Sequence, residues 1–389
     1  MMPMEIASGI YDVGATDWIV RDFHGYKTER GASYNSYLIV DEKICLIDTV
    51  KACYADELLE KIRRVADPAK IDYVVVNHVE PDHAGALPEV LKAAPNAKFV
   101  ITMQGKNEAL RHYGDGFDFM VVKEGDKISL GSRELTFVPM PMLHWPDNMV
   151  TYCLQDGILF SNDAFGQHYA SSKRFDDEVD EYVLFYEAKK YFANILWPYA
   201  RLIGGALKKA SALDIKMIAP AHGVIWRSKI AQILEKYAAW GTGVNGKSVV
   251  IAYDTMWGGT EALARAMVEG AAAAGVKVQL MRMDRTPCST VAAELFEAGG
   301  LLVGSPTLNS GMMPTIGGML VYLKGLQPKG KKAAAFGTCG WAGGAQKDME
   351  AMLTAGGFEL QPGFNCKWRA CVDETEAARQ FAYEFAKNL

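Results

Sequence analysis

Four side chains able to bind a metal ion lie within six residues of the sequence. They fall in the segment NHVEPDH (residues 77–83), which supplies two histidines and two carboxylates directly after the apolar run YVVV (residues 73–76). Histidine and carboxylate side chains are common metal ligands. A buried cluster of such groups is costly unless its members are paired or bound to metal. The segment therefore predicts a metal site at the end of a buried strand.

Three more candidate ligands follow apolar runs later in the chain. His144, Asp163 and His222 each stand where such a run ends. Strands that end at one edge of a sheet bring residues distant in sequence together. We therefore expect a single site built from seven residues. These are His78, Glu80, Asp82, His83, His144, Asp163 and His222.

The ligand types favour iron over zinc. Three carboxylates beside four imidazoles form a hard, anionic set that can bridge two ions and stabilise oxidised iron, whereas zinc hydrolases usually keep an imidazole-rich set. Glu80 and His83 match the Glu-x-x-His spacing of a di-iron helix bundle once, but Pro81 and the preceding strand argue against a bundle helix. We predict a non-haem di-iron centre, with a dinuclear zinc hydrolase as the alternative.

Three glycine-containing loops form a second group with possible chemistry. Residues 254–260 (DTMWGGT), 304–310 (GSPTLNS) and 337–344 (GTCGWAGG) each follow an apolar run. Hydroxyl and backbone N–H groups at a helix N-terminus can cradle a phosphate. The first loop lacks both the P-loop lysine and the G-x-G-x-x-G spacing. Together the three loops suit a planar, phosphate-bearing ligand with polar ring edges, and FMN fits best. The expected FMN-binding residues are Thr255, Met256, Trp257, Gly258, Gly259, Thr260, Ser305, Pro306, Thr307, Leu308, Asn309, Thr338, Cys339, Gly340, Trp341 and Gly343.

Two patterns of expected elements must position these groups. Up to about residue 240, strand signals come as hairpins over residues 37–49 and 150–162, the second around an Asp-Gly turn. Helical patterns cover residues 56–65 and the long region 180–209. This half predicts an α+β core of two packed sheets with outer helices.

Past the polar, glycine-rich segment 241–246, strands and helices alternate. Strands are expected at 248–253, 277–283, 300–306 and 332–338, with a less clear one near 358–370. Helices are expected at 261–274, 289–298, 315–324, 345–355 and 374–388. Five strands alternating with helices predict a parallel, doubly wound sheet, in which ligands bind at the carboxyl ends of the strands. The three glycine loops all lie at such ends.

Composition restricts the classes of function. A chain of 389 residues, half of them hydrophobic, is long enough for two or three domains, and its net charge of −5 argues against a nucleic-acid-binding face. We expect no secretion signal and no membrane span, because the longest uncharged stretch, 298–323, is interrupted by prolines and glycines. Seven cysteines without a C-x-x-C pair favour reduced thiols in the cytoplasm and exclude a rubredoxin-type iron site on this chain.

Each half of the sequence resembles a known family. Residues 30–240, with the segment LIDT (residues 46–49) and the ligand motif, resemble the metallo-β-lactamase family, whose hydrolases carry His-x-His-x-Asp-His. Glu80 stands at the second histidine position. Residues 246–389, with hydroxyl residues in the first glycine loop, resemble flavodoxin-like domains.

Taken together, the two halves strongly resemble the flavodiiron proteins, also called A-type flavoproteins, of the rubredoxin:oxygen oxidoreductase type in their minimal two-domain form. The resemblance implies a metallo-β-lactamase-like αββα sandwich that holds the di-iron centre over residues 1–243. It implies a flavodoxin-like, doubly wound FMN domain over residues 247–389.

The resemblance also implies an activity, which is reduction of O2 to water, or of NO to N2O, with electrons passing through FMN. His24 would be the pocket histidine that forms a hydrogen bond with the bound diatomic. Some family members leave the position of His83 unligated. The ligand sets, mapped by motif position, are His78, Glu80 and His144 for one iron, and Asp82, His83 and His222 for the other, with Asp163 bridging.

Partners follow from the same resemblance. Family members form a head-to-tail homodimer, or a dimer of such dimers, that places the FMN of one subunit against the di-iron centre of the other. Electrons would come from an external donor, either rubredoxin or a reduced deazaflavin. A second alternative is a flavin electron carrier whose lactamase-like half only mediates dimerisation. We expect a cytoplasmic protein without nucleic-acid or membrane partners.

Overall fold

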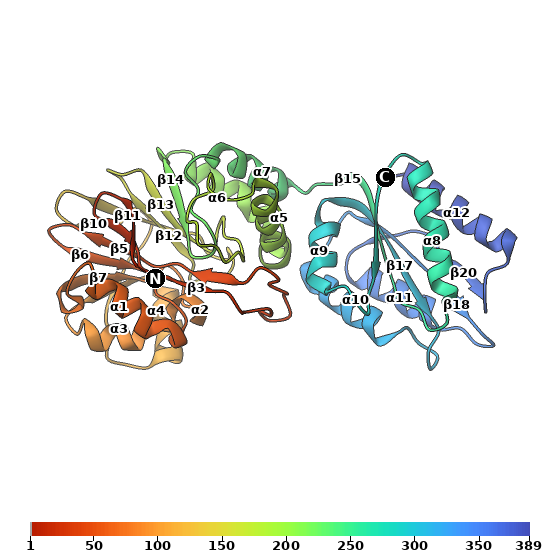
Figure 1. The fold of residues 1–389 in the computed structure, drawn as a ribbon, viewed down its shortest axis with the longest axis horizontal. Helices are drawn as coiled ribbons and strands as arrows, with labels where there is room; N and C mark the ends of the chain where they lie inside the picture. The colour runs from red at the N-terminus through yellow and green to blue at the C-terminus, as the bar shows by residue number, and fades with distance from the viewer. Residues whose placement is uncertain (1) are drawn as a thin grey trace. The chain divides into compact units, whose positions relative to one another are not determined.

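The computed structural model describes residues 2–389, which form two compact units. The first unit comprises residues up to 21, 28–191 and 201–241, and the remaining residues form the second. Figure 1 follows the chain through both units. Within residues 2–389, no helix is long and apolar enough to cross a membrane.

Two β-sheets form the centre of the first unit. The seven-stranded sheet has, in spatial order, β1 (Met4–Ala7), β2 (Ile10–Asp12), β5 (Tyr37–Val40), β6 (Ile44–Ile47), β7 (Ile71–Val75), β8 (Lys98–Ile101) and β9 (Asp118–Val121). The five-stranded sheet has β10 (Lys127–Ser129), β11 (Glu134–Pro139), β12 (Met149–Cys153), β13 (Ile158–Asn162) and β14 (Met217–Pro220). A separate ribbon pairs β3 (Ala15–Asp17) with β4 (Ala32–Tyr34).

Side chains that alternate along the strands give the first unit two apolar cores. Leu46 and Val74 face the core under the outer helices, whereas Ile47 and Val75, their neighbours in sequence, face the core between the two sheets. The helices of the unit are α1 (Ala55–Arg63), α2 (Pro81–Ala84), α3 (Leu87–Ala93), α4 (Met103–Tyr113), α5 (Glu181–Tyr191), α6 (Ile203–Ala210) and α7 (Ile230–Thr242). Helices cover the outer faces of both sheets (Figure 1), which gives the predicted αββα sandwich.

The second unit is built on one parallel sheet. Its strands, in spatial order, are β16 (Lys277–Arg282), β15 (Gly246–Tyr253), β17 (Ala298–Pro306), β18 (Lys332–Cys339) and β19 (Glu359–Leu360), with β20 (Phe364–Lys367) also paired to β18. The helices are α8 (Gly259–Ala273), α9 (Cys288–Glu297), α10 (Pro314–Leu326), α11 (Ala345–Ala355) and α12 (Val372–Lys387). Helices α9, α10 and α11 pack on one face and α8 and α12 on the other. The predicted doubly wound sheet is confirmed.

Two expected elements differ from the structure. The single helical region at 180–209 is interrupted after α5 by a π-helical turn and a 3-10 segment before α6 begins. Pro198 lies in this interruption and cannot donate a backbone hydrogen bond inside a helix. The strand expected near 358–370 is two short strands, β19 and β20, with Pro362 between them.

Candidate functional site

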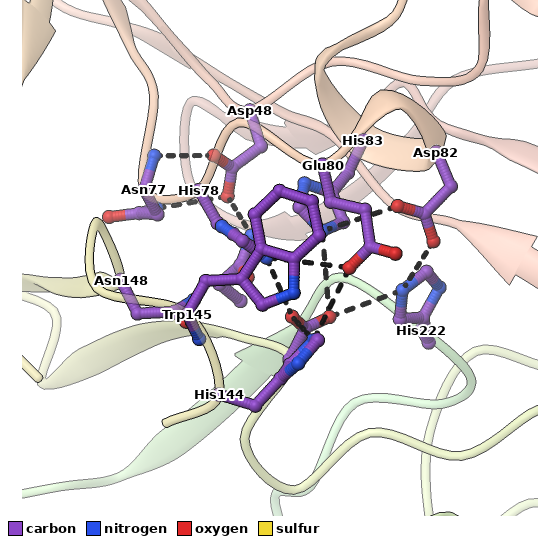
Figure 2. Close-up of polar contacts among 12 residues, drawn as sticks. Asp48, Asn77, His78, Glu80, Asp82, His83, His144, Trp145, Asn148 and His222 are labelled. Carbon is purple, nitrogen blue, oxygen red and sulfur yellow. Dashed lines mark hydrogen bonds and ion pairs between the residues drawn. The ribbon is translucent and has the colours of Figure 1, made fainter. Parts of the chain in front are cut away.

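The seven predicted metal ligands meet at one edge of the two sheets in the first unit. His78 and Glu80 lie in the loop after β7, and Asp82 and His83 lie in α2, which begins at Pro81. A proline at the first helical position lets the chain turn directly from the loop into this short helix. The other three come from the loop between β11 and β12 and from the ends of β13 and β14; they are His144, Asp163 and His222. Figure 2 shows the labelled ligands pointing toward a common centre.

The carboxylate of Asp163 divides this cluster into two groups. Its Oδ2 atom lies 3.4 Å from His144 Nε2 and 3.7 Å from His78 Nε2. Its Oδ1 atom lies 3.3 Å from His222 Nε2 and 3.6 Å from His83 Nε2. One carboxylate oxygen therefore faces each pair of imidazoles.

A second carboxylate completes each group. Glu80 Oε2 lies 3.3 Å from His144 Nε2 and 3.5 Å from His78 Nε2. In the other group, Asp82 Oδ2 lies 3.2 Å from His222 Nε2, and Asp82 Oδ1 lies 3.4 Å from His83 Nε2. Ligand atoms held about 2.1 Å from one metal ion lie about 3 Å apart, so these spacings suit two ions that share Asp163.

Unsatisfied buried atoms test whether these residues fit metal ions. Within residues 2–389, His78 Nε2, His83 Nε2, Asp82 Oδ1 and Asp163 Oδ2 are buried and make no hydrogen bond. Buried polar atoms in proteins nearly always have a partner. A pair of metal ions would supply that partner to all four atoms, so the residues fit a dinuclear centre.

A cavity of about 420 Å³ lies at the carboxyl ends of β15, β17 and β18 in the second unit. Most of the predicted FMN-binding residues line it, namely Thr255, Met256, Trp257, Gly259, Pro306, Thr307, Leu308, Asn309, Thr338, Cys339, Gly340 and Trp341. The loop with Thr255 leads into α8, so free N–H groups of a long helix point toward this end of the cavity. A Cβ at Gly259 would lie 3.0 Å from the Trp368 carbonyl oxygen, which explains the glycine there. The cavity fits FMN.

Four of the predicted FMN residues do not line this cavity. Gly258 is the N-cap residue just before α8, with a positive φ of 81°, and its N–H donates to Thr255 Oγ1. Thr260 shares a buried hydrogen bond with Thr338, and Ser305 accepts one from the backbone of residue 313. These three shape the loops, because their polar groups are used within the protein. A Cβ added at Gly343 would have no other atom within 4 Å.

The whole chain is similar to proteins with this pair of sites. Residues 32–223 match the ODP family beta lactamase model, and residues 251–381 match the flavodoxin model. The nitric oxide reductase of Moorella thermoacetica is 46% identical over 394 residues, which cover 100% of this chain and 99% of that protein. The crystal structure of the flavodiiron protein from Giardia intestinalis is 38% identical, covers 100% of this chain and 96% of that one, and has a TM-score of 0.98.

The rubredoxin oxygen:oxidoreductase from Desulfovibrio gigas is also 38% identical, with 100% of this chain and 98% of that chain covered and a TM-score of 0.97. The chain belongs to the flavodiiron protein family. The predicted family, fold class and cofactors, FMN and a non-haem di-iron centre, are thereby confirmed. This flavodiiron protein is an oxidoreductase, and the zinc hydrolase alternative is not favoured.

Groups behind the ligands of this flavodiiron protein hold the imidazoles in place. His78 Nδ1 lies 2.8 Å from Asp147 Oδ1, and His222 Nδ1 lies 2.7 Å from the Ser33 carbonyl oxygen. Since a carboxylate and a carbonyl can only accept, Nδ1 carries the hydrogen in both rings and Nε2 is left as the ligand atom. Asp147 and Ser33 were not among the residues predicted from the sequence. Asp147 lies three residues after His144, which is the only local signal for it.

Charges in the cluster favour bound cations. Burial alone would lower the pKa of His78, but the hydrogen bond with Asp147 and the nearby carboxylate of Glu80 outweigh it and raise the pKa to about 9. Burial would also lower the pKa of His144, but the carboxylates of Asp163 and Glu80 outweigh it and raise the pKa to about 9. Burial would raise the pKa of Glu80, but His144 and His78 lower it to about 2. Without metal the cluster is a set of ion pairs, and metal binding replaces protons on the imidazoles.

His24 belongs to the second unit and not to the unit that holds the metal cluster, and Trp368 lines the FMN cavity without a signal in the sequence. His24 is exposed, has a positive φ of 53°, and belongs to the segment 22–27 that groups with the second unit. The structure does not place it in the seven-residue cluster. Trp368 also lines the FMN cavity, as do Ser310 and Ala342, which lie in two of the predicted loops but were not among the predicted FMN-binding residues. Trp368 follows β20, whose sequence gave only a weak strand signal.

Proposed function

We propose that this chain reduces O2 to water, NO to N2O, or both, at the seven-residue site, with electrons delivered through FMN. The observation that carries the proposal is the Asp163 carboxylate, which presents one oxygen to each of two His and carboxylate groups. Two ferrous ions and a reduced flavin together supply the four electrons that reduction of O2 to water requires. Relatives named nitric oxide reductase and rubredoxin oxygen:oxidoreductase support this activity.

Residues of the chain would hold the two ions and control protons beside them. Tyr191 donates a hydrogen bond of 3.0 Å from its hydroxyl to Asp163 Oδ1. Burial raises the pKa of Tyr191 well above 10, so the hydroxyl keeps its proton and remains a donor to this carboxylate. The proposed ligand sets are His78, Glu80 and His144 for one ion, and Asp82, His83 and His222 for the other, with Asp163 bridging.

The electron donor, the oligomeric state and the cellular location are part of the same proposal. We infer that rubredoxin or a reduced deazaflavin supplies electrons to a cytoplasmic, head-to-tail homodimer. The domains would extend over residues 1–243 and 247–389, and His24 would contact the substrate. Trp257 and Trp341 at the FMN cavity are 96% and 89% exposed, which supports a protein partner at this surface.

Turnover of the iron-loaded protein, reduced under anaerobic conditions and then supplied with O2 or with NO, tests the activity, and kcat/KM for the two gases measures the preference. Glu80→Ala is expected to abolish electron transfer to either gas while FMN stays bound, because it removes a carboxylate from one metal group. Glu89→Ala, which removes an exposed carboxylate, is the matched control. Zinc in place of iron with hydrolase activity would contradict the proposal. Undiminished transfer in the Glu80 variant would instead favour a flavin carrier.

A further inference from the structure

Glu108 is a half-buried carboxyl residue of α4 that is not one of the seven candidate metal ligands. The helix is fixed at its start by Thr102, the N-cap residue. The Thr102 hydroxyl group accepts a hydrogen bond of 3.0 Å from the Gly105 N–H and donates one of 3.0 Å to the Asp147 carbonyl oxygen. Glu108 lies about one turn after Gly105, next to the buried Ala109, and so on the side of the helix that faces this loop.

The side chain of Asp147 acts as a hydrogen-bond acceptor on both of its oxygens. Its Oδ1 atom lies 2.8 Å from His78 Nδ1, and its Oδ2 atom accepts a bond of 2.8 Å from the Val79 N–H. The residue is almost fully buried. Asp147 therefore connects the back of one candidate metal ligand with the face of α4.

The Glu108 carboxyl group meets Asp147 at its inner end. Its Oε2 atom is buried and, within residues 2–389, has no hydrogen-bond donor. The carboxyl group nevertheless lies within hydrogen-bond contact of the Asp147 carboxyl group. Two carboxyl groups can form a hydrogen bond only if one of them carries a proton. Because Asp147 already accepts on both oxygens, the proton belongs to Glu108, and it gives the buried Oε2 atom a partner.

The surroundings of Glu108 favour this protonated form near neutral pH. Burial and the charge of Asp147 raise the pKa of Glu108 to about 7, while positive charge on His78 opposes the shift. The titratable groups that face Glu108 are Asp147, from the loop after β11, and His78, from the loop after β7. Since the side chain is only half-buried, its proton can exchange with solvent.

We propose that Glu108 is a positioning residue for the redox reaction, because it donates a hydrogen bond to Asp147 and thereby sets how basic the His78 imidazole is as a metal ligand. A carboxylate that accepts from Nδ1–H of a ligand histidine makes the ligand more basic. A hydrogen bond from Glu108 takes up part of the negative charge of Asp147 and weakens this effect. Protonation of Glu108 and reduction of the metal site therefore favour each other. The inference rests on the proposed function in taking His78 as a metal ligand.

The reduction potential of the iron in the full-length, FMN-containing protein tests this coupling. The native potential should fall as the pH rises from 6 to 8. Glu108→Gln, whose amide N–H donates to Asp147 at every pH, should match the native potential at pH 6. At pH 8 it should lie above the native value by up to about 59 mV, which is tenfold in the equilibrium constant of a one-electron couple.

Two further variants separate the hydrogen bond from the charge. Glu108→Ala removes the hydrogen bond at every pH, so its potential should lie below the native value at pH 6. Glu89→Gln removes an exposed carboxylate and should follow the native protein at both pH values. A potential in Glu108→Ala equal to the native value at pH 6 would contradict the role of the hydrogen bond.

Infrared spectroscopy of the same samples provides a readout that does not depend on activity or on iron. The C=O band of a protonated carboxyl group should be present at pH 6, weaken by pH 8 and be absent at both in Glu108→Gln. Glu187 gives a band of the same kind, so the difference between the native and variant spectra isolates Glu108.

Equal pH dependence of the potential in the native and Glu108→Gln proteins, or identical carboxyl bands in the two, would overturn the inference alone. Failure of the native chain to bind iron would overturn the proposed function and this inference with it. Iron content, measured on each sample, distinguishes the two failures.

Discussion

At the scale of single residues, Asp163 decides whether the ligands act as one site or two. Its two oxygens face different imidazole pairs, and its side chain is almost fully buried. Glu80 and Asp82 each face one group, whereas His83 lies within 4.8 Å of possible ligand atoms of both groups. A change at Asp163 therefore affects both ions, whereas a change at Glu80 or Asp82 affects one ion directly.

Asp163→Asn is expected to lower the metal affinity of the protein by about ten- to a hundredfold. The reason is that one shared anionic oxygen is replaced by an amide nitrogen, which cannot bind a cation. Metal content after gel filtration measures the change, with FMN content as an internal reference. Asp214→Asn, at an exposed carboxylate, should leave the metal content unchanged. Equal metal content in the two variants would contradict the bridging role.

Glu187, which is not a candidate metal ligand, makes the stability of the folded protein depend on pH. Burial raises the pKa of this carboxyl to about 7, while Lys190 and Arg30 oppose the shift and Glu29 adds to it. The unfolded chain, with an ordinary glutamate pKa, loses the proton at lower pH than the folded protein. This group therefore contributes a stability that falls as pH rises through the interval between the two pKa values.

Glu187→Gln is expected to match the native protein at pH 5 and to exceed it by about 1–3 kcal/mol in free energy of unfolding at pH 8, because the amide carries no charge to bury. Urea unfolding at both pH values measures the difference. Glu181→Gln, on the exposed side of the same helix, controls for removal of a charge. A difference that does not change with pH would show that ionisation of Glu187 is not the cause.

At the scale of elements, both sites lie where strands end, which is why loops with little regular structure can hold their residues accurately. The candidate metal ligands follow β7, β11, β13 and β14, and the FMN cavity follows β15, β17 and β18. The sheets depend in turn on close helix packing. Gly270 of α8 contacts the backbone of Arg379 in α12, so that no Cβ fits between the two helices.

Gly270→Ala is expected to destabilise the second unit by about 1–3 kcal/mol, since the added methyl group must push two helix backbones apart. Gly318→Ala in α10, where the added methyl meets no atom within 4 Å, should instead be neutral or stabilising by up to about 1 kcal/mol. Urea unfolding followed by flavin fluorescence reports on this unit. Effects of the same sign and size would contradict the role of helix contact.

At the scale of the whole molecule, each unit carries the residues for one cofactor. All seven candidate metal ligands belong to the first unit, and all residues that line the FMN cavity belong to the second. A ligand that binds only the folded form of a unit stabilises that unit according to its own concentration and affinity. The two cofactors should therefore stabilise separate parts of the chain.

Removal of the metal ions with a chelator is expected to leave FMN bound and to lower the unfolding temperature of the first unit by several degrees. Metal content, flavin absorbance and calorimetry on the same sample measure these quantities. The reverse treatment, release of FMN by dilution, should leave the metal content unchanged. Loss of flavin in step with metal would show that the two sites are coupled.

The sequence by itself predicted the seven candidate metal ligands and how the second half folds. Four ligands lie within residues 77–83, and apolar runs alternate with helical patterns after residue 246, so local spacing was sufficient for both inferences. It also predicted most of the FMN loops, because glycines and hydroxyl residues mark the strand ends directly.

Only the tertiary structure decided which oxygen of Asp163 faces which imidazoles, that Asp147 stands behind His78, and that Trp368 closes the FMN cavity. His78 and Asp147 are 69 positions apart, and Trp368 reaches the cavity through the pairing of β20 with β18. Contacts of this kind join segments whose local patterns are independent. Their geometry is fixed by sheet order and core packing, which act over the whole unit and leave no signal in any short window of sequence.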